Sequence, residues 1–478
     1  IAWEVNPVYG WIQKNPKADG TLYDIYADGL RIYTTIDSRM QQHAQDAMRD
    51  HMSDLQRRFF REKKGSPSAP YTSDPEELSP ATRKQLIRNA IKQSERYRVA
   101  KVAGLSDAEI EQQFNTPFDM TMFSYDGPVD TTMTPRDSIL YTKHFLRAGF
   151  MAMDPTNGHV KAYVGGPDFR FFQYDMVSRG KRQVGSTIKP FLYALAMEGD
   201  ESGSDSFTPC SMLSNTQPVI TLPDGQTWMP RNSGKARVGE MVDLRWALTN
   251  SNNWISARLI QEVHPSELVK YMHNMGITSK LPAVPSLALG PAEISLREMV
   301  TGYSAFANQG SYSQPLYVTA ITDNSGNVLA TFRPNRTEAI GRQAYYRILS
   351  ILLNVVDSGT GNRLRRPPYS LSAQIGGKTG TTNNNSDGWF MGFTPDLVAG
   401  AWVGGDERYI HFNTMANGQG AEMALPIFGR FMRAVYDDPK LNYSQSARFE
   451  FPADINICGN YVPEAPETVE QTVEGYFD

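Results

Sequence analysis

Residues 181–191 read Lys-Arg-Gln-Val-Gly-Ser-Thr-Ile-Lys-Pro-Phe, and a further apolar run follows at 192–197. Ser186 and Lys189 stand three positions apart, so on a helix their side chains share one face and Lys189 can reach the Ser186 hydroxyl. A serine is a weak nucleophile without a base, and a lysine becomes a base only where burial or a nearby cation lowers its pKa well below about 10.4. The segment therefore predicts a serine nucleophile and a lysine base at the start of an apolar helix.

The Ser-x-x-Lys pattern is weak by itself, because a chain of this length holds about two such patterns by chance. A second one begins at Ser178, where Gly180 and the basic pair 181–182 offer nothing to fix a helix. Pro190 favours the first site, since the first turn of a helix tolerates proline better than the interior does. We therefore expect Ser186, and not Ser178, to be the reactive serine.

A second polar motif, Ser251-Asn252-Asn253, lies between expected helices at 241–248 and 254–263. Taken alone it is also compatible with a local cap or turn. The same Ser-x-Asn pattern occurs at 325–327, but there it lies inside an expected hairpin turn at 323–327. The motif at 251–253 is therefore the candidate for chemistry.

A third motif, Lys378-Thr379-Gly380-Thr381, ends a strand-like run at 372–379. Glycine on an edge strand lets a substrate backbone approach closely, and two hydroxyls together with a lysine can hold a carboxylate. A plain polar strand end is the alternative interpretation. Lys-Thr-Gly occurs once in this chain, against a chance expectation of about 0.1.

The pattern around these motifs predicts an α+β fold. Apolar runs at 150–153 and 160–164 are joined by an Asp-Pro-Thr-Asn-Gly turn, and the runs at 372–379, 388–393 and 397–403 predict an antiparallel meander. A capping box at Ser295 and Glu298 opens a helix that Gly310 can end, and a last helix is expected at 422–436. We therefore expect an antiparallel sheet, flanked by helices, whose strands come from both ends of the domain, plus a mostly helical subdomain.

The first 150 residues predict a strand at 29–36 and a long amphipathic helix capped by Asp37. The apolar face of that helix carries Met40, Ala44, Ala47, Met48, His51 and Leu55. A turn-rich linker at 63–80 leads to a basic helical stretch at 81–102, which we interpret as a solvated helix face.

Composition narrows the class of protein. The chain has 478 residues, which is more than one hydrophobic core usually serves. Its net charge of −4 provides no positive electrostatic field to attract the phosphates of a nucleic acid. Its two cysteines, Cys210 and Cys458, form no Cys-x-x-Cys pair, and we expect buried thiols while leaving their pairing open. There is no Gly-x-Ser-x-Gly elbow and no His-Glu-x-x-His, which disfavours a Ser-His-Asp hydrolase and a metallohydrolase.

In this order, Ser-x-x-Lys, Ser-x-Asn and Lys-Thr-Gly form the set found in serine β-lactamases and penicillin-binding proteins. The chain resembles the transpeptidase portion of a class A, bifunctional penicillin-binding protein without its glycosyltransferase domain. The resemblance also rests on FMAMDPTNGHVKAYVGG at 150–166, KRQVGSTIKPF at 181–191, ALG at 288–290, GGKTGTT at 376–382 and WFMGFTP at 389–395, while GLRIYTTID at 29–37 resembles the family's linker.

The resemblance implies a penicillin-binding, serine transpeptidase-like fold and four parts. These are an interdomain linker region at 1–36, a linker helix with an accessory segment at 37–149, the transpeptidase domain at 150–440, and an acidic, partly ordered tail at 441–478. It implies no cofactor and no metal. An upstream glycosyltransferase domain and membrane anchor are expected as partners, which would place the protein in the cell envelope, on the outer face of the cytoplasmic membrane.

Residue roles follow from the resemblance position by position. Ser186 would attack a D-Ala-D-Ala stem peptide, and a neighbouring stem peptide's amine would then accept the acyl group. Lys189 would act as the base, Ser251 would relay a proton to the leaving group, and Asn253 would form a hydrogen bond with the substrate amide. Lys378 would support the electrostatic field around Lys189, and Thr379 and Thr381 would bind the substrate carboxylate around Gly380. The backbone N–H groups of Ser186 and Thr381 would form the oxyanion hole, and Trp228 and Asn232 would form part of the cleft wall.

Departures from the related β-lactamases bear on the reaction. Asn252 stands where class A β-lactamases have Asp, and the chain lacks the Glu-x-x-Leu-Asn that carries their deacylating glutamate. Fast β-lactam hydrolysis is therefore disfavoured, and β-lactams are expected to be inhibitors. Two alternatives remain open: a DD-carboxypeptidase with the same residues, and a β-lactam-sensing or peptidoglycan-binding receptor without turnover.

Overall fold

The computed structural model describes residues 7–199, 207–222, 224–232 and 234–458. Its centre is a five-stranded antiparallel sheet in the order β16-β17-β18-β4-β5. The strands are β4 (Arg147–Met153), β5 (Val160–Val164), β16 (Gly376–Thr381), β17 (Asp387–Phe393) and β18 (Val398–Gly404). Because β4 pairs with β18, with Phe150 opposite Ala401, the expected meeting of strands from both ends of the domain is confirmed.

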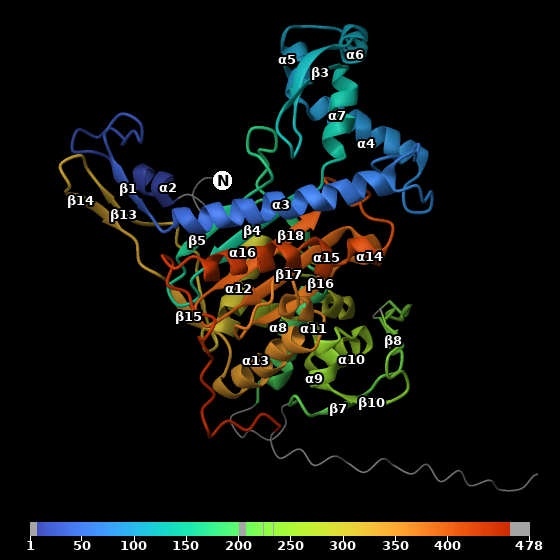
Figure 1. The fold of residues 1–478 in the computed structure, drawn as a ribbon, viewed down its shortest axis with the longest axis vertical. Helices are drawn as coiled ribbons and strands as arrows, with labels where there is room; N and C mark the ends of the chain where they lie inside the picture. The colour runs from blue at the N-terminus through green and yellow to red at the C-terminus, as the bar shows by residue number, and fades with distance from the viewer. Residues whose placement is uncertain (1–6, 200–206, 223, 233, 459–478) are drawn as a thin grey trace, which may run out of the picture.

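Both faces of the sheet are buried, and alternate residues of each strand point to opposite faces. Met151 and Trp402 face one core with α8 (Lys189–Met197), α12 (Leu296–Ala307) and α13 (Arg342–Asp357). Phe150 and Ala401 face the other core with α3 (Ser38–Lys63) and α16 (Leu425–Asp437). In Figure 1 α3 and α16 lie side by side over the sheet, and α8 and α13 lie beneath it. The α+β fold class is thus confirmed.

A mostly helical part fills the chain between the two groups of strands. Besides α8, α12 and α13 it contains η1 (Gly185–Ile188), α9 (Leu244–Thr249), α10 (Asn253–Val263), α11 (Pro265–Asn274), η2 (Pro285–Leu289) and η3 (Asn362–Arg365). Short antiparallel pairs join its loops, namely β6 (Lys181–Gln183) with β11 (Glu293–Ser295), β7 (Met212–Ser214) with β10 (Met241–Asp243), β8 (Ile220–Thr221) with β9 (Thr227–Trp228), and β12 (Ser311–Ser313) with β15 (Arg336–Glu338).

Several predicted boundaries need correction. The helix expected at 241–248 begins only at Leu244, because 241–243 pair with β7 as β10 and Asp243 caps the helix. The strand expected at 372–379 begins at Gly376, since the backbone of Ser372 donates to the side chain of Gln445. The last helix is divided into α15 (Gly420–Met423) and α16, and η4 (Asn383–Asn385) and α14 (Met415–Gly418) were not expected. The capping box at Ser295 is confirmed.

The N-terminal residues form a small lobe together with a hairpin that lies far away in the sequence. It contains α2 (Pro7–Lys14), β1 (Arg31–Thr34), β13 (Val318–Thr322) and β14 (Val328–Thr331). The expected strand at 29–36 is therefore present, and it pairs with β13 almost 290 residues later. Asp37 caps α3, as predicted, by accepting hydrogen bonds from the backbone of Arg39 and Met40. In Figure 1 this lobe projects from the body beside one end of α3.

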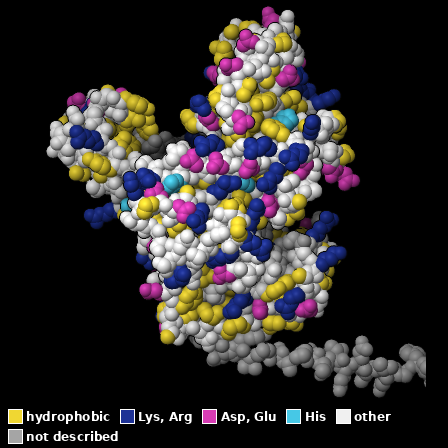
Figure 2. Space-filling model, viewed as in Figure 1, with side chains coloured by type: hydrophobic (Ala, Val, Ile, Leu, Met, Phe, Trp, Pro, Cys, Tyr) yellow, Lys and Arg dark blue, Asp and Glu magenta, His cyan; other side chains and the backbone are white. Residues whose placement is uncertain are grey.

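A second lobe stands on the other end of α3 (Figure 1). It contains α4 (Pro80–Gln93), α5 (Glu95–Val102), α6 (Asp107–Asn115), β2 (Phe118–Met122), β3 (Val129–Met133) and α7 (Pro135–Lys143). The basic stretch at 81–102 is two helices, because Ser94 ends the first and caps the second. Figure 2 shows basic and acidic side chains interspersed along this side of the molecule, in keeping with the predicted solvated face.

The two cysteines are joined in a disulfide between Cys210 and Cys458, with their Cα atoms 5.2 Å apart. The expectation of two buried thiols is therefore wrong, and both residues are half-buried. Residues 441–458 fold back along the helical part, where Phe449 packs on Phe393 and Asp454 pairs with Arg342 at 2.6 Å. The part of the expected acidic tail after 458 lies outside the described residues.

A buried ion pair links the segment before Ser186 to the sheet. Arg182 Nε lies 2.6 Å from Asp387 Oδ1, the Asp387 side chain is fully buried, and Trp402 Nε1 also donates to it at 3.0 Å. Removing one partner of a buried pair leaves the other charge without compensation. We therefore expect Asp387→Ala to lower the free energy of unfolding by about 3–5 kcal/mol, measured by urea titration.

Asp454→Ala is the matched control, because it breaks an exposed pair with Arg342 and should hardly move the urea midpoint. Equal midpoints for the two variants would contradict a structural role for the buried pair.

Candidate active site

Ser186 lies in η1, at the junction between the sheet and the helical part. Three contacts hold this turn: Gly185 N–H donates to Gly290 O at 3.0 Å, Tyr303 OH donates to Thr187 O at 2.7 Å, and β6 pairs with β11 just before it. Pro190 lies in the first turn of α8, as the sequence predicted. Ser186 is half-buried, and its hydroxyl makes no hydrogen bond with any of the described residues.

Lys189 opens α8, and its side chain is fully buried. Its Nζ donates to Ser251 O at 2.7 Å and to Asn253 Oδ1 at 2.7 Å, and Ser251 Oγ lies 3.4 Å away. Burial, followed by the charge of nearby Lys378, holds the pKa of Lys189 well below its usual value. The side chain is thus suited to act as a neutral amine, although the expected hydrogen bond from Lys189 to Ser186 is absent from the described contacts.

Ser251 lies in the sharp turn between α9 and α10, and its φ of 56° falls in the left-handed region. Such backbone strain is often stored at functional sites. Its hydroxyl lies 2.9 Å from Lys378 Nζ and 3.4 Å from Lys189 Nζ, and so bridges the two amines. Asn253, the third residue of the motif, holds Lys189 from the first turn of α10.

Lys378 reaches the same point from β16, on the opposite wall. It is fully buried, and that burial lowers the pKa of Lys378 to about 7. Burial thus shifts both amines toward the uncharged form, and their titration belongs to the two groups together.

The rest of β16 lies against the turn that carries Ser186. A Cβ on Gly380 would lie 2.8 Å from Val184 O and 2.8 Å from Thr187 Cγ2, so glycine is needed for contact between the strand and this turn. That Gly380 also lets a substrate backbone approach closely stays a prediction. Thr379 Oγ1 donates to Thr360 Oγ1 at 2.8 Å, and Thr381 Oγ1 accepts from Gly420 N–H at 2.9 Å.

The two residues expected in the cleft wall differ in position. Asn232 Oδ1 accepts from Asn253 N–H at 3.1 Å, so Asn232 lies beside the site and holds its second motif. Trp228 lies in the short β8–β9 hairpin, and no hydrogen bond or ring contact of the described residues joins it to the three motifs. Only Asn232 is therefore brought to the site by a described contact.

Sequence reasoning missed three supporting residues. Asn252 caps α10 through Ile255 N–H, which explains why Asn can stand in place of Asp there. Thr360 lies in the turn after α13, and nothing in its local sequence marks it as a neighbour of Thr379. Gly290, within the Ala-Leu-Gly block at 288–290, packs against Gly185 with a positive φ of 74°, and the sequence signals only that glycine permits such a φ.

Comparison with known proteins agrees with this geometry. Residues 66–146 match the family described as penicillin-binding protein middle domain, and residues 148–404 match the penicillin binding protein transpeptidase domain. The second match covers more than half of the chain and contains all three motifs.

Relatives and solved structures extend the comparison. The chain is 27% identical to penicillin-binding protein 1A of Aquifex aeolicus over 94% of this chain and 59% of that protein, and 33% identical to that of Neisseria lactamica over 60% of this chain and 36% of that protein. It therefore spans less than two thirds of their length.

Among solved structures, penicillin-binding protein 1A of Haemophilus influenzae has a TM-score of 0.65 at 22% identity, covering 92% of this chain and 70% of that one. PonA1 of Mycobacterium tuberculosis has a TM-score of 0.61 at 18% identity, covering 99% of both chains. These two show the fold, while the transpeptidase match shows the family. The chain therefore belongs to the penicillin-binding protein family and corresponds to the transpeptidase portion of its class A members.

Proposed function

We propose that this protein is a peptidoglycan DD-transpeptidase that works through an acyl-enzyme on Ser186. The observation that carries the proposal is the Ser251 hydroxyl, which lies 3.4 Å from the buried amine of Lys189 and 2.9 Å from that of Lys378. A serine becomes an activated nucleophile beside a base, and Lys189, three residues after Ser186 and with a lowered pKa, supports that assignment.

The first half-reaction forms the ester. Ser186 Oγ attacks the carbonyl of the penultimate D-Ala, and its proton passes to the neutral Nζ of Lys189. The N–H groups of Ser186 and Thr381 stabilise the oxyanion, which accords with the packing of Gly185 against Thr381. The C–N bond then breaks, and the leaving D-Ala amine takes a proton through the Ser251 hydroxyl, which returns Lys189 to its neutral form.

The second half-reaction forms the cross-link. The amine of a second stem peptide attacks the ester carbonyl, loses a proton to Lys189, and the C–O bond to Ser186 breaks as Ser186 Oγ takes a proton back. Asn253 binds the substrate amide, and Thr379 and Thr381 bind its carboxylate beside Gly380. Trp228 and Asn232 form the outer wall of the cleft.

β-Lactams are proposed to acylate the same serine. PonA1 of Mycobacterium tuberculosis, which has a TM-score of 0.51 to this chain, has been solved in complex with penicillin V. The chain has no glutamate in the position that deacylates class A β-lactamases, and its Asn252 side chain is used to cap α10. Slow release of the acyl group is therefore expected, which makes the protein an antibiotic target in cell-wall synthesis.

The proposed location is the cell envelope, outside the cytoplasmic membrane, with a glycosyltransferase domain and a membrane anchor upstream. The Cys210–Cys458 disulfide supports an oxidising compartment. No helix among the described residues is long and apolar enough to cross a bilayer. No group of His, Cys, Asp and Glu in the described part of the chain could hold a metal ion, and the proposed reaction uses none.

Two other functions share this site and are separated by one experiment. The protein is incubated with a pentapeptide ending in D-Ala-D-Ala, with and without an amine acceptor, and products are resolved by mass spectrometry. A transpeptidase gives acceptor adduct in excess over hydrolysed tetrapeptide. Tetrapeptide alone would indicate a carboxypeptidase, and the absence of D-Ala release with both donor and acceptor present would indicate a receptor.

The lysine pair gives a pH prediction. Acylation should slow as pH falls, because protonation of Lys189 removes the base. Lys378→Met removes the neighbouring charge that lowers the pKa of Lys189, so the acid limb should move to higher pH. The measurement is the acylation rate with a chromogenic cephalosporin between pH 5 and pH 9. An unchanged or lower acid limb in Lys378→Met would contradict this assignment of charges.

A further inference from the structure

A cavity of about 770 Å³ lies away from the three motifs, where three parts of the chain meet. Its walls come from α3, from the turn between β2 and β3, and from the loop 165–175 that follows β5. The second wall lies in the part that matches the middle domain and the third in the part that matches the transpeptidase domain, while α3 precedes both matches. We call it the junction cavity; ligand sites occur preferentially at such domain interfaces.

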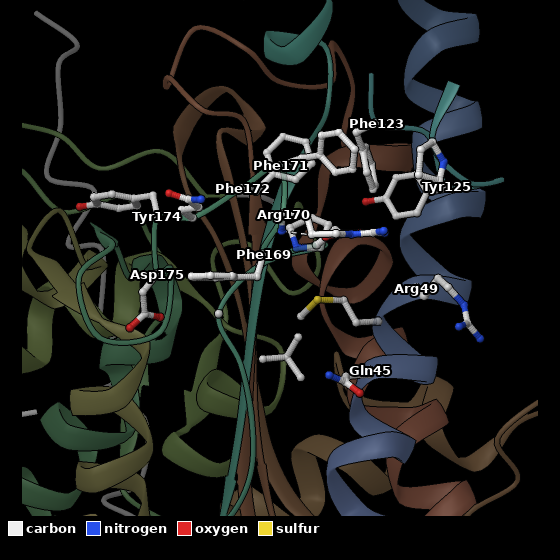
Figure 3. Close-up of a pocket in the computed structure, with 18 of the residues that line it drawn as sticks. Gln45, Arg49, Phe123, Tyr125, Phe169, Arg170, Phe171, Phe172, Tyr174 and Asp175 are labelled. Carbon is white, nitrogen blue, oxygen red and sulfur yellow. Dashed lines mark hydrogen bonds and ion pairs between the residues drawn. The ribbon is translucent and has the colours of Figure 1, made fainter. Parts of the chain in front are cut away.

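The floor of the junction cavity is aromatic and closely packed. Phe123 and Phe172 are buried and their ring centroids lie 4.9 Å apart, with Phe171 packed against them. Figure 3 shows these rings side by side at one end of the cavity. A floor that is already packed needs no rearrangement to receive a ligand.

The rim carries aromatic side chains that remain in water. Phe169 is 76% exposed and Tyr174 is 62% exposed, although both line the junction cavity. No ring contact among the described residues involves either of them. Two exposed aromatic rings beside a closely packed aromatic floor offer faces on which a second ring can stack.

Uncharged polar groups line the same space. Gln45 extends from α3 toward the cavity in Figure 3 and makes no hydrogen bond with any described residue. The Tyr125 hydroxyl is buried and has no described partner, and in Figure 3 it points inward, toward Arg170. Two hydrogen-bonding groups are therefore unused in the described structure.

The charged groups of the lining already have partners, either in ion pairs or in a hydrogen bond from a neutral hydroxyl. Arg170 binds Asp168 at 2.6 Å, Arg49 binds Asp46 at 2.8 Å, and Asp175 accepts from the Tyr163 hydroxyl at 2.6 Å. The charged residues of the lining are Arg49, Arg170, Asp168 and Asp175, so their formal charges cancel. The cavity fits a neutral ligand with apolar ring faces and hydroxyl or amide edges.

An added peptide strand does not fit this wall. β5 is the edge of the sheet, but the Gln41 side chain accepts from Tyr163 N–H at 2.8 Å and donates to Tyr163 O at 3.0 Å. The backbone groups that would pair with a peptide at Tyr163 are thus occupied. Side-chain recognition remains, which suits a sugar ring better than an extended backbone.

We propose that the junction cavity binds sugar rings of a peptidoglycan glycan strand, a chain of β-linked, N-acetylated amino sugars. The C–H faces of the pyranose rings stack on Phe169 and the aromatic floor, and the hydroxyl and acetamide groups bond to Gln45 and Tyr125. The choice of this glycan rests on the proposed function, since stem peptides are attached to it. The cavity would hold the polymer while its peptides reach Ser186.

The test titrates the Ser186→Ala protein with peptide-free ligands: an N-acetylglucosamine tetramer and amidase-stripped glycan strands, by calorimetry. Saturable binding is expected, and Phe169→Ala and Gln45→Ala should each weaken it by about fivefold or more. Tyr26→Ala is the matched control, because Tyr26 is 89% exposed on the N-terminal lobe and should leave the affinity unchanged. Both Phe169 and Gln45 are exposed, so these variants should fold, which thermal unfolding checks.

Two results would overturn the proposal: no glycan binding, or equal binding by all three variants. The ligands carry no peptide and the titrated protein has no Ser186 hydroxyl, so the outcome is independent of acylation. Wild-type protein that acylates without binding glycan would remove only this proposal. Glycan binding by a protein that never acylates would remove only the transpeptidase assignment.

Discussion

Replacing Lys189 by methionine is expected to slow the acylation of Ser186 by a penicillin about a thousandfold, the range associated with loss of a general base. Lys189 is fully buried and holds the loop of Ser251 and Asn253, so methionine keeps most of the volume while removing the amine. The measurement is the second-order rate of acylation by stopped-flow fluorescence, with thermal unfolding as a check on folding.

Lys189→Arg is the matched control. Arginine keeps a positive charge and hydrogen-bond donors but cannot act as a neutral base, so it should be as slow as methionine. Near-normal acylation by either folded variant would show that another group takes the proton from Ser186. Recovery in the arginine variant alone would mean that charge, and not basicity, is what Lys189 supplies.

Gly290→Ala is expected to give the second large effect. Gly290 has a φ of 74°, and a Cβ there would lie 2.0 Å from Gly185 O and 2.6 Å from Gly185 N. The backbone at Gly290 and the backbone at Gly185 must then move apart, and Gly185 is the residue directly before Ser186. We expect a loss of about 3 kcal/mol or more in the free energy of unfolding and at least about tenfold slower acylation.

Gly326→Ala is the control that separates backbone strain from a steric clash. Gly326 also has a positive φ, of 90°, but a Cβ there would meet nothing within 4 Å. Its substitution should cost only the backbone strain of about 1–2 kcal/mol and leave acylation unchanged. Equal effects of the two substitutions on acylation would contradict the contact between Gly290 and the Ser186 turn.

Local patterns predicted the elements that carry their own signals. Asp37 and Ser295 cap the helices that follow them, and the strand-like runs at 388–393 and 397–403 predicted two strands of the central sheet. The Ser-x-x-Lys, Ser-x-Asn and Lys-Thr-Gly motifs, whose catalytic roles stay proposals, do meet at one place. Each of these features depends on residues close in sequence or on a short motif of fixed spacing.

Contacts between distant segments could not be predicted in the same way. The pairing of β1 with β13 and the disulfide between Cys210 and Cys458 depend on how distant parts of the chain pack together. The sequence around one partner does not identify the other. The hydrogen bonds of Lys189 are a similar case. Spacing on a helix placed it beside Ser186, but the turn at Ser251 offers it carbonyl and amide acceptors that helix geometry alone does not reveal.

The claim that Ser186 forms the acyl-enzyme is tested most directly by intact mass spectrometry after incubation with a penicillin, followed by a peptide map. Wild-type protein should gain one stoichiometric adduct that lies on the peptide containing Ser186 and persists for many minutes, and Ser186→Ala should gain none. An adduct that maps to Ser178 or elsewhere, or folded wild-type protein that gains no adduct, would contradict the account.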